Sequence, residues 1–438
     1  MINKPKIGIV CLARKTFDHN AAKEIYSRIC LELEKDKSVD YFFIENLVIE
    51  IDEAQEAAKI LSTKQLDAYV CISGTFHLGH LLLELNKALN KPVLLWGLPE
   101  LPYDGGKIRL NSVCGVNLNA SNLYKSGVKN YCYHIGNNID KDWVKAISII
   151  SALSLARIGL LGYGAMGFFN VVTDDLNLYR NTGVLLEHYE LSELFNFPFA
   201  AKDVSDSNIK FTKHFDTTDI NTEQINKVAE LTAHIKAFVE YHKLDALSIR
   251  CWPEFAATYG ISPCAAMSLL QSEDYILACE GDVEGAISML AHKAAGAKTP
   301  FLADFSQLNL EENFALLWHC GVAPCNLTNG KCKPTLDTYF AGGKGVTAGF
   351  VMKEGNVSIN RIDSANGEYR IFLQKAEAVF MEKDLKGTYM KAIFDTNVSE
   401  VLDKVVSNGI AHHVSVVYGD YIKSFEILAK IKGWKVIK

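Results

Sequence analysis

The first third of the chain alternates between short apolar runs and amphipathic runs, and this rhythm constrains the fold more than any other feature. The strand-like runs are residues 6–13, 39–45, 67–74 and 91–97, and the helical runs between them are residues 18–36, 53–66 and 77–89. Short apolar runs separated by amphipathic helices are typical of βαβ units around a parallel sheet. Ligands approach such a sheet at the carboxyl ends of its strands.

The alternation starts again near residue 157. Its predicted strands are residues 157–162, 183–191, 244–250 and 275–280, and its predicted helices are residues 225–244, 263–271 and 283–295. A chain of 438 residues is too long for one ordinary core, so two to three domains are expected. We therefore predict two Rossmann-like parallel-sheet domains over residues 1–155 and 156–296.

The last stretch, residues 297–438, has a different rhythm. Residues 346–363 and 369–382 read as strands, with hairpin-like turn signals at residues 354–356 and at Asn366-Gly367. A helix over residues 420–433 and a final strand over residues 434–438 close the chain. The predicted fold class is thus α/β, with two parallel-sheet domains followed by a β-rich C-terminal domain.

Composition and charge exclude several classes of protein. With 45 basic and 51 acidic residues the formal charge is −6, and no basic cluster predicts binding to nucleic acid. The N-terminus has no signal-peptide pattern, and no run of about 18 apolar residues predicts a membrane span. The eleven cysteines are scattered rather than arranged as a disulfide framework. We expect a cytoplasmic protein that binds neither nucleic acid nor membranes.

One motif favours an oxidoreductase. Residues 162–167 read G-x-G-x-x-G after a predicted strand, and Glu187 follows about 20 residues later, where a ribose-binding acid would stand. This spacing is typical of NAD(P)-binding domains. The alternative is a glycine-rich turn that packs tightly or approaches another ligand, because a nearly complete α/β domain precedes this motif.

Two acidic residues end successive predicted strands near the middle of the chain. Glu280 closes the strand at residues 275–280, Asp282 can cap the helix that follows, and Asp304 lies in the next strand. Two converging carboxylates repel unless they share a proton or a metal ion. With His412 or His413 they would form an oxygen-rich site that favours Mn²⁺ or Mg²⁺. A helix cap, a salt bridge or a surface histidine pair would explain the same residues without a metal.

The run CEGDVEGAISMLAHKAAGAKTPFLAD resembles the matching segment of the L-fucose isomerase and L-arabinose isomerase-like family, including the spacing from Glu280 to Asp304. The late run GIAHHVSVVYGD is similar to the C-terminal ligand region of the family. The resemblance implies that Glu280, Asp304 and His413 bind Mn²⁺, or Mg²⁺ or Co²⁺ in its place, and that Glu280 and Asp304 also move protons. It further implies a homo-oligomer, either a trimer or a hexamer.

Weaker similarities concern the substrate. YFAGGKG resembles a glycine-rich substrate loop in which Lys344 replaces the expected residue, and GLLGYGAMG resembles the start of the second domain of the family. Arg250 and Trp252 stand where the resemblance leads us to expect glutamines, and His412 is expected beside the substrate. Arg14, after the first strand, is a further candidate contact. Arginine contacts would suit an anionic sugar.

The sequence therefore predicts a metal-dependent aldose–ketose isomerase that acts on a pentose, a deoxyhexose or a modified hexose through an enediol. Two alternatives stay open. One is an NAD(P)-dependent oxidoreductase that uses the loop from Gly162 to Gly167, and the other is a non-catalytic sugar-binding protein.

Overall fold

The computed structural model describes residues 3–339 and 343–438, which form two compact units. The N-terminal unit comprises the chain up to residue 152 together with residues 423–434, and the C-terminal unit comprises residues 153–422 and 435–438. The predicted fold class is confirmed, because two parallel sheets precede a large mixed sheet. The division into three domains at residues 155 and 296 stays a prediction.

The N-terminal unit is an open parallel sheet with the strand order β2-β1-β3-β4-β5. Its strands are β1 (Lys6–Leu12), β2 (Asp40–Phe43), β3 (Ala68–Ser73), β4 (Val93–Gly97) and β5 (Tyr131–Ile135). Its helices are α1 (His19–Leu33), α2 (Ile51–Ser62), α3 (His80–Leu89), α4 (Ser112–Lys125), α5 (Lys141–Leu155) and α13 (Ile422–Lys432).

Both faces of this sheet are buried. Ile7 and Ile9 of β1 belong to an apolar core that includes side chains of α1 and α5, whereas Val10 and Leu12 belong to a second core with α2 and α3. Successive side chains of a strand point to opposite faces, so a strand covered on both sides must be apolar throughout. This explains why the strands of this unit read as continuous apolar runs.

The C-terminal unit begins with a parallel sheet of order β7-β6-β8-β9. The strands are β6 (Arg157–Leu161), β7 (Leu185–Tyr189), β8 (Ala246–Ile249) and β9 (Leu277–Cys279). The helices of this region are α6 (Asp175–Thr182), α7 (Leu191–Phe195), α8 (Ala201–His214), α9 (Thr222–His242), α10 (Cys264–Gln271) and α11 (Val283–Ala294).

A mixed sheet of nine strands follows, in the order β12-β13-β16-β11-β10-β17-β14-β15-β18. The strands are β10 (Phe301–Asn309), β11 (Phe314–His319), β12 (Thr335–Asp337), β13 (Thr347–Val351), β14 (Gly355–Ala365), β15 (Glu368–Val379), β16 (Thr388–Phe394), β17 (His413–Tyr418) and β18 (Lys435–Ile437), with α12 (Val398–Ser407) between β16 and β17. Because β15 also pairs with β16, the antiparallel strands β16-β11-β10-β17-β14-β15 close into a ring.

The two predicted hairpin turns have different outcomes. Asn366-Gly367 joins β14 to β15, which pair along their whole length, so this prediction is confirmed. The prediction at residues 354–356 was wrong, because β13 pairs with β12 and β16 rather than with β14. Gly355, at the start of β14, has a φ of 139°, and the chain passes there from β13 to a strand with which β13 does not pair.

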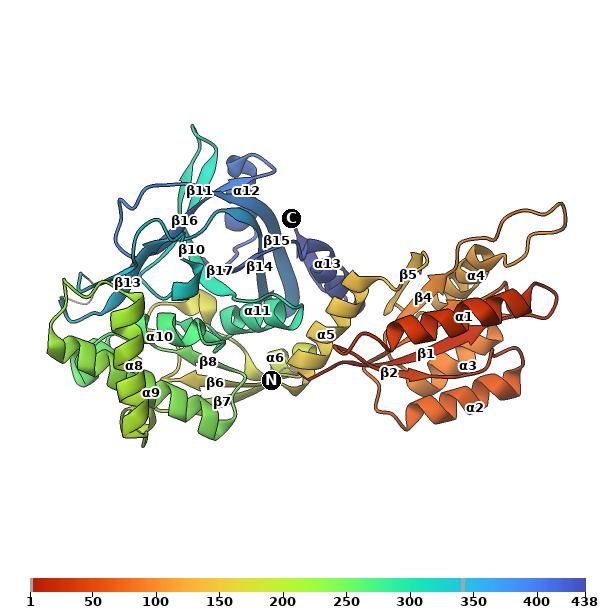
Figure 1. Ribbon diagram of the computed structural model, residues 1–438, viewed down its shortest axis with the longest axis horizontal. Helices are drawn as coiled ribbons and strands as arrows, with labels where there is room; N and C mark the ends of the chain where they lie inside the picture. The colour runs from red at the N-terminus through yellow and green to blue at the C-terminus, as the bar shows by residue number, and fades with distance from the viewer. Residues whose placement is uncertain (1–2, 340–342) are drawn as a thin grey trace. The chain divides into compact units, whose positions relative to one another are not determined.

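Helix α11 packs against both sheets of the C-terminal unit. It contacts β8 and β9 of the parallel sheet and β14 and β17 of the mixed sheet (Figure 1). Nearly all its side chains are buried, as expected for a helix that is covered on every side. The start of α11 therefore lies where the ends of both sheets meet. Among the described helices, none combines the length and apolarity needed to cross a lipid bilayer.

Candidate functional site

Strand register brings Asp304 and His413 together although they are far apart in sequence. Strands β10 and β17 are antiparallel neighbours, and Asp304 stands directly opposite His413 in their register. Glu280 follows β9 and has a φ of 61°, a left-handed conformation that is uncommon for a residue with a side chain. Such strained positions persist where the surrounding structure holds them, often at functional sites.

The structure brings together the three residues that we predicted as metal ligands. His413 Nε2 lies 3.4 Å from Asp304 Oδ1 and 3.5 Å from Glu280 Oε2. Within the described chain, neither His413 Nε2 nor Asp304 Oδ1 has a hydrogen-bond partner, although both atoms are buried. Buried polar atoms are normally hydrogen-bonded, so these two atoms are suited to a ligand between them.

The other nitrogen of His413 is occupied. Its Nδ1 lies 2.9 Å from Asp282 Oδ2, and Asp282 in turn accepts a short hydrogen bond from Arg361 Nη1. Burial alone would raise the pKa of Asp282, but Arg361 and His413 hold it well below its usual range. An ionised Asp282 can only accept, so Nδ1 of His413 carries a proton and Nε2 is the ring nitrogen that faces Glu280 and Asp304.

The three predicted ligands differ in how far their side chains are exposed to solvent. The His413 side chain is 0% exposed, whereas those of Glu280 and Asp304 are 16% and 23% exposed. Burial raises the pKa of Asp304 to about 6. Burial also acts to raise the pKa of Glu280, but the hydrogen bond with His412 and the charge of His413 lower it below its ordinary value. The two carboxyl groups thus differ in proton affinity and are both open to a ligand.

His412 lies beside Glu280 on the more exposed side. Its Nε2 is 3.1 Å from Glu280 Oε2, and the Asn170 amide lies 3.1 Å from its Nδ1. Its ring is 5.6 Å from that of Phe168, which also contacts Trp252. Burial alone would lower the pKa of His412, but Glu280 and Asp304 raise it. His412 therefore links the acidic pair to the loop after β6.

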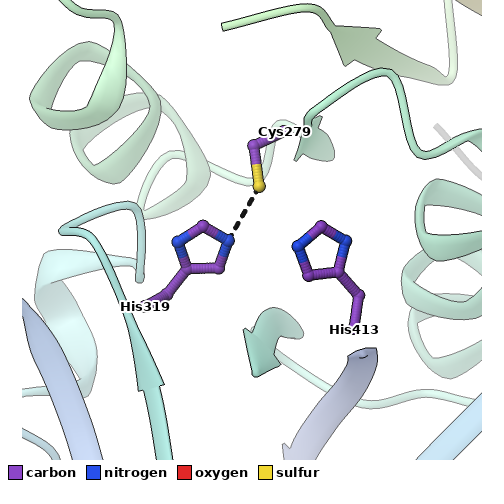
Figure 2. Close-up of side chains that lie close together, drawn as sticks. All are labelled: Cys279, His319 and His413. Carbon is purple, nitrogen blue, oxygen red and sulfur yellow. Dashed lines mark hydrogen bonds between the residues drawn. The ribbon is translucent and has the colours of Figure 1, made fainter. Parts of the chain in front are cut away.

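Among the described residues, two sets of three side chains have ligand atoms within 4.8 Å of one another: Glu280, His412 and His413, and Cys279, His319 and His413. Figure 2 shows the second set, in which Cys279 Sγ lies 2.8 Å from His319 Nε2. His319 Nδ1 accepts the backbone N–H of Cys320, so the ring proton resides on Nε2 and points at sulfur. Cys279 and His319 thus satisfy each other, which leaves the set with Glu280 better suited to a cation; Asp304 belongs to neither set, although its Oδ1 lies 3.4 Å from His413 Nε2.

The glycine-rich loop has a packing role in this site. A Cβ on Gly281, whose φ is 73°, would lie 2.7 Å from the Tyr163 carbonyl oxygen and 3.1 Å from Gly164 Cα. The loop after β6 therefore packs backbone against backbone on the turn that carries Glu280. Such close approach requires a glycine at position 281, whereas a Cβ on Gly164 would meet only Val172 Cγ2, at 3.3 Å.

This loop lacks the geometry of a dinucleotide fingerprint. The fingerprint needs a helix to begin at the loop, yet a short 3₁₀ turn over Phe169–Val171 follows it and α6 begins only at Asp175. Glu187 is also engaged, because it lies 2.7 Å from Arg157 Nε and accepts a hydrogen bond from Tyr189. The structure therefore does not support the NAD(P) alternative.

The predicted substrate-binding residues lie in different places. Arg250 follows β8, next to the strand that ends at Cys279, and forms a 3.0 Å ion pair with Glu254. Lys344 is exposed in a turn, and residues 340–342 of the predicted substrate segment lie outside the described residues. Arg14 belongs to the N-terminal unit, where it follows β1 and its backbone N–H bonds Thr75.

Several site residues were missed from the sequence. Asp282 was predicted only as the cap of α11, which is confirmed, since its side chain accepts the Gly285 N–H. Arg361 reads as an ordinary polar position in a strand, and nothing in its spacing links it to Asp282. The sequence did not favour His319 as a metal ligand, because its set with Cys320, Cys325 and Cys332 lacks the C-x-x-C pair of a zinc site. Arg361 is fully buried, and a buried guanidinium needs partners, but this burial is visible only in the structure.

Comparison with known proteins points to a family of sugar isomerases. Two sequence models match the chain: "Fucose/sulfoquinovose isomerase, N-terminal domain" over residues 8–150, and "L-fucose isomerase, C-terminal domain" over residues 317–438. A sulfoquinovose isomerase of Priestia aryabhattai is 28% identical over 421 residues, which is 94% of each chain. Relatives of the same name from Alkalicoccus urumqiensis and Clostridium sp. (strain MSTE9) are 26% and 27% identical, over 85% and 75% of this chain and 86% and 76% of theirs.

Solved structures add nothing to this assignment. A periplasmic solute-binding protein from Actinobacillus succinogenes 130z with bound D-allose covers 67% of this chain and 93% of its own, at 10% identity and a TM-score of 0.18. A TM-score this low carries no argument for the sugar-binding alternative. Both family models and the near full-length relatives agree, and the chain belongs to the L-fucose isomerase-like family of sugar isomerases.

Proposed function

We propose that this protein is a metal-dependent aldose–ketose isomerase whose Glu280, Asp304 and His413 hold a divalent cation, Mn²⁺ or Mg²⁺ or Co²⁺ in its place. One observation carries the proposal: His413 Nε2, buried and without a hydrogen bond in the described chain, faces two carboxylate oxygens at 3.4 and 3.5 Å. Two carboxylates and one imidazole form a mixed set of oxygen and nitrogen ligands. Such a set suits Mn²⁺ better than it suits a structural zinc ion.

The proposed chemistry is a proton transfer between neighbouring sugar carbons. When bound, the ion would act as a Lewis acid on the sugar oxygens and acidify the proton on C2. One of the two carboxylates, Glu280 or Asp304, takes the C2 proton and gives it to O1, which forms the enediol. The other takes the O2 proton and gives it to C1, so the ketose forms and both carboxylates are restored. His412, 3.1 Å from Glu280 Oε2, orients that carboxylate.

We further propose that the substrate is an anionic hexose of the sulfoquinovose type. The relatives that match over most of this chain are sulfoquinovose isomerases. Arg250, at the strand end beside the one that leads to Glu280, has an Nε without a hydrogen-bond partner among the described residues. An arginine fork suits a sulfonate. Arg14, Trp252, Lys344 and His412 stay proposed substrate contacts, and the trimer or hexamer stays a prediction.

The test is an isomerisation assay on the full-length protein. The enzyme is stripped with EDTA, restored with Mn²⁺, and given sulfoquinovose, L-fucose, L-arabinose or D-glucose, while proton NMR in D₂O follows ketose formation and exchange at C2. We expect turnover only with Mn²⁺, fastest on the sulfonated sugar. Glu280→Gln should lower kcat by about 10²- to 10⁴-fold, the usual contribution of a positioned acid or base.

The matched control is Glu311→Gln, which makes the same change on the exposed turn between β10 and β11. It should retain wild-type activity. Turnover that survives EDTA or the Glu280→Gln change would contradict the metal site. A preference for neutral sugars would contradict the proposed substrate but not the proposed reaction.

A further inference from the structure

A fully buried chain of charged groups lies behind His413. Asp282 Oδ2 accepts hydrogen bonds from His413 Nδ1, at 2.9 Å, and from Arg361 Nη1. The side chains of all three residues are 0% exposed. The other carboxylate oxygen, Oδ1, accepts the Gly285 N–H at 2.7 Å and caps α11. One carboxylate thus joins the start of α11 to strands β14 and β17.

The packing around this carboxylate leaves it little freedom. A Cβ on Gly285 would lie 2.7 Å from Asp282 Cγ, so only a glycine permits the carboxylate to sit there. Arg361 is further surrounded by Glu284 Oε2 at 3.8 Å and Asp363 Oδ2 at 4.0 Å. A buried arginine is costly unless carboxylates compensate it, so this cluster holds Arg361, and Arg361 holds Asp282.

We propose that Asp282 and Arg361 are positioning residues that fix the ring orientation and the Nδ1–H tautomer of His413, so that its Nε2 lone pair faces Glu280 and Asp304. This inference rests on the proposed function, because it assigns a role in cation binding at that site. A carboxylate behind a ligating histidine raises its basicity and fixes its tautomer, and the loss of such a partner typically weakens metal affinity by about 10- to 100-fold.

A purely structural role makes a different prediction. If Asp282 mattered only as a helix cap, serine would replace it without loss, because serine caps helices as well as aspartate does. Serine is too short to reach both His413 and Arg361. Asp282→Ser therefore keeps the cap and removes the link, whereas Asp282→Asn retains an oxygen that can accept from His413 Nδ1.

The experiment measures Mn²⁺ binding to the full-length, EDTA-treated protein by titration calorimetry and Mn²⁺ electron paramagnetic resonance. We expect the dissociation constant to rise by about 10- to 100-fold in Asp282→Ser and by less in Asp282→Asn. In parallel, ¹⁵N-histidine NMR of the metal-free protein, recorded at alkaline pH so that the ring is neutral, should show His413 as the Nδ1–H tautomer in the wild type and as a mixture in Asp282→Ser. A cap or a packing role would not move either readout.

Two further variants keep the proposal falsifiable. Asp282→Ser combined with Arg361→Met avoids an unpaired buried charge if the single variant does not fold, and it should bind Mn²⁺ as weakly. Asp337→Asn removes a buried carboxylate of β12 that pairs with Lys386 and lies outside the cluster around Arg361, and it should leave Mn²⁺ affinity unchanged.

The outcomes separate this inference from the function on which it rests. Wild-type Mn²⁺ affinity in Asp282→Ser, or an equal loss in Asp337→Asn, would overturn the positioning role while the metal site stands. A wild type that binds no Mn²⁺ would overturn the proposed function and the positioning role together.

Discussion

Glu284 provides a pH test of the buried cluster around Arg361. Its side chain is 3% exposed, accepts a 2.8 Å hydrogen bond from Ser364 and lies 3.8 Å from Arg361. Burial, opposed by Arg361 and reinforced by Asp363, raises the pKa of Glu284 from 4.5 to about 8. At neutral pH the folded protein therefore keeps a proton on this carboxyl group that the unfolded chain releases.

The sign of the effect follows from proton linkage. Between pH 4.5 and about 8 the folded state binds more protons than the unfolded state, so the free energy of unfolding falls as the pH rises. The contribution is fully present below pH 4.5 and is lost as the pH rises through about 8. At about 1.4 kcal/mol per pH unit, the shift is worth at most about 5 kcal/mol.

Glu284→Gln should remove this dependence, because glutamine does not titrate and its oxygen can still accept from Ser364. Urea unfolding in EDTA, followed by circular dichroism from pH 5 to 8.5, measures the difference between variant and wild type. We expect that difference to grow in favour of Glu284→Gln by a few kcal/mol across this range. Glu400→Gln, an exposed acid in the first turn of α12, is the matched control and should follow the wild type. Parallel pH profiles for wild type and Glu284→Gln would refute the reasoning.

Two further predictions concern the site. Gly281→Ala should destabilise the protein by about 1–3 kcal/mol more than Gly296→Ala and should lower activity. Both glycines have a positive φ, but only at Gly281 would a Cβ lie against the backbone of Tyr163 and Gly164. Urea unfolding and initial rates measure the two effects, and equal losses of stability in the two variants would contradict the close packing. Adding Mn²⁺ to EDTA-treated protein at about 100 times its dissociation constant should raise the free energy of unfolding by about 2.7 kcal/mol. Thermal unfolding with and without Mn²⁺ measures this, and an unchanged Tm would contradict the proposed metal site.

Much of the fold could be predicted from the sequence because it depends on local pattern. Apolar runs with strand and helix spacing predicted both parallel sheets, and Asn366-Gly367 predicted the β14–β15 hairpin. The failure at residues 354–356 has a clear cause. A turn signal shows that the chain changes direction, but not whether the flanking strands pair with each other, and β13 pairs elsewhere.

The candidate site divides in the same way. The sequence by itself determined that Glu280 ends a strand, that Asp282 caps the next helix and that an acid and a histidine pair follow, because each depends on close neighbours. Only the tertiary structure decided that Asp304 stands opposite His413 and that Arg361 reaches Asp282. Those contacts join residues about 80 to 110 positions apart through β register and the burial of α11, and no local propensity encodes register across a closed sheet.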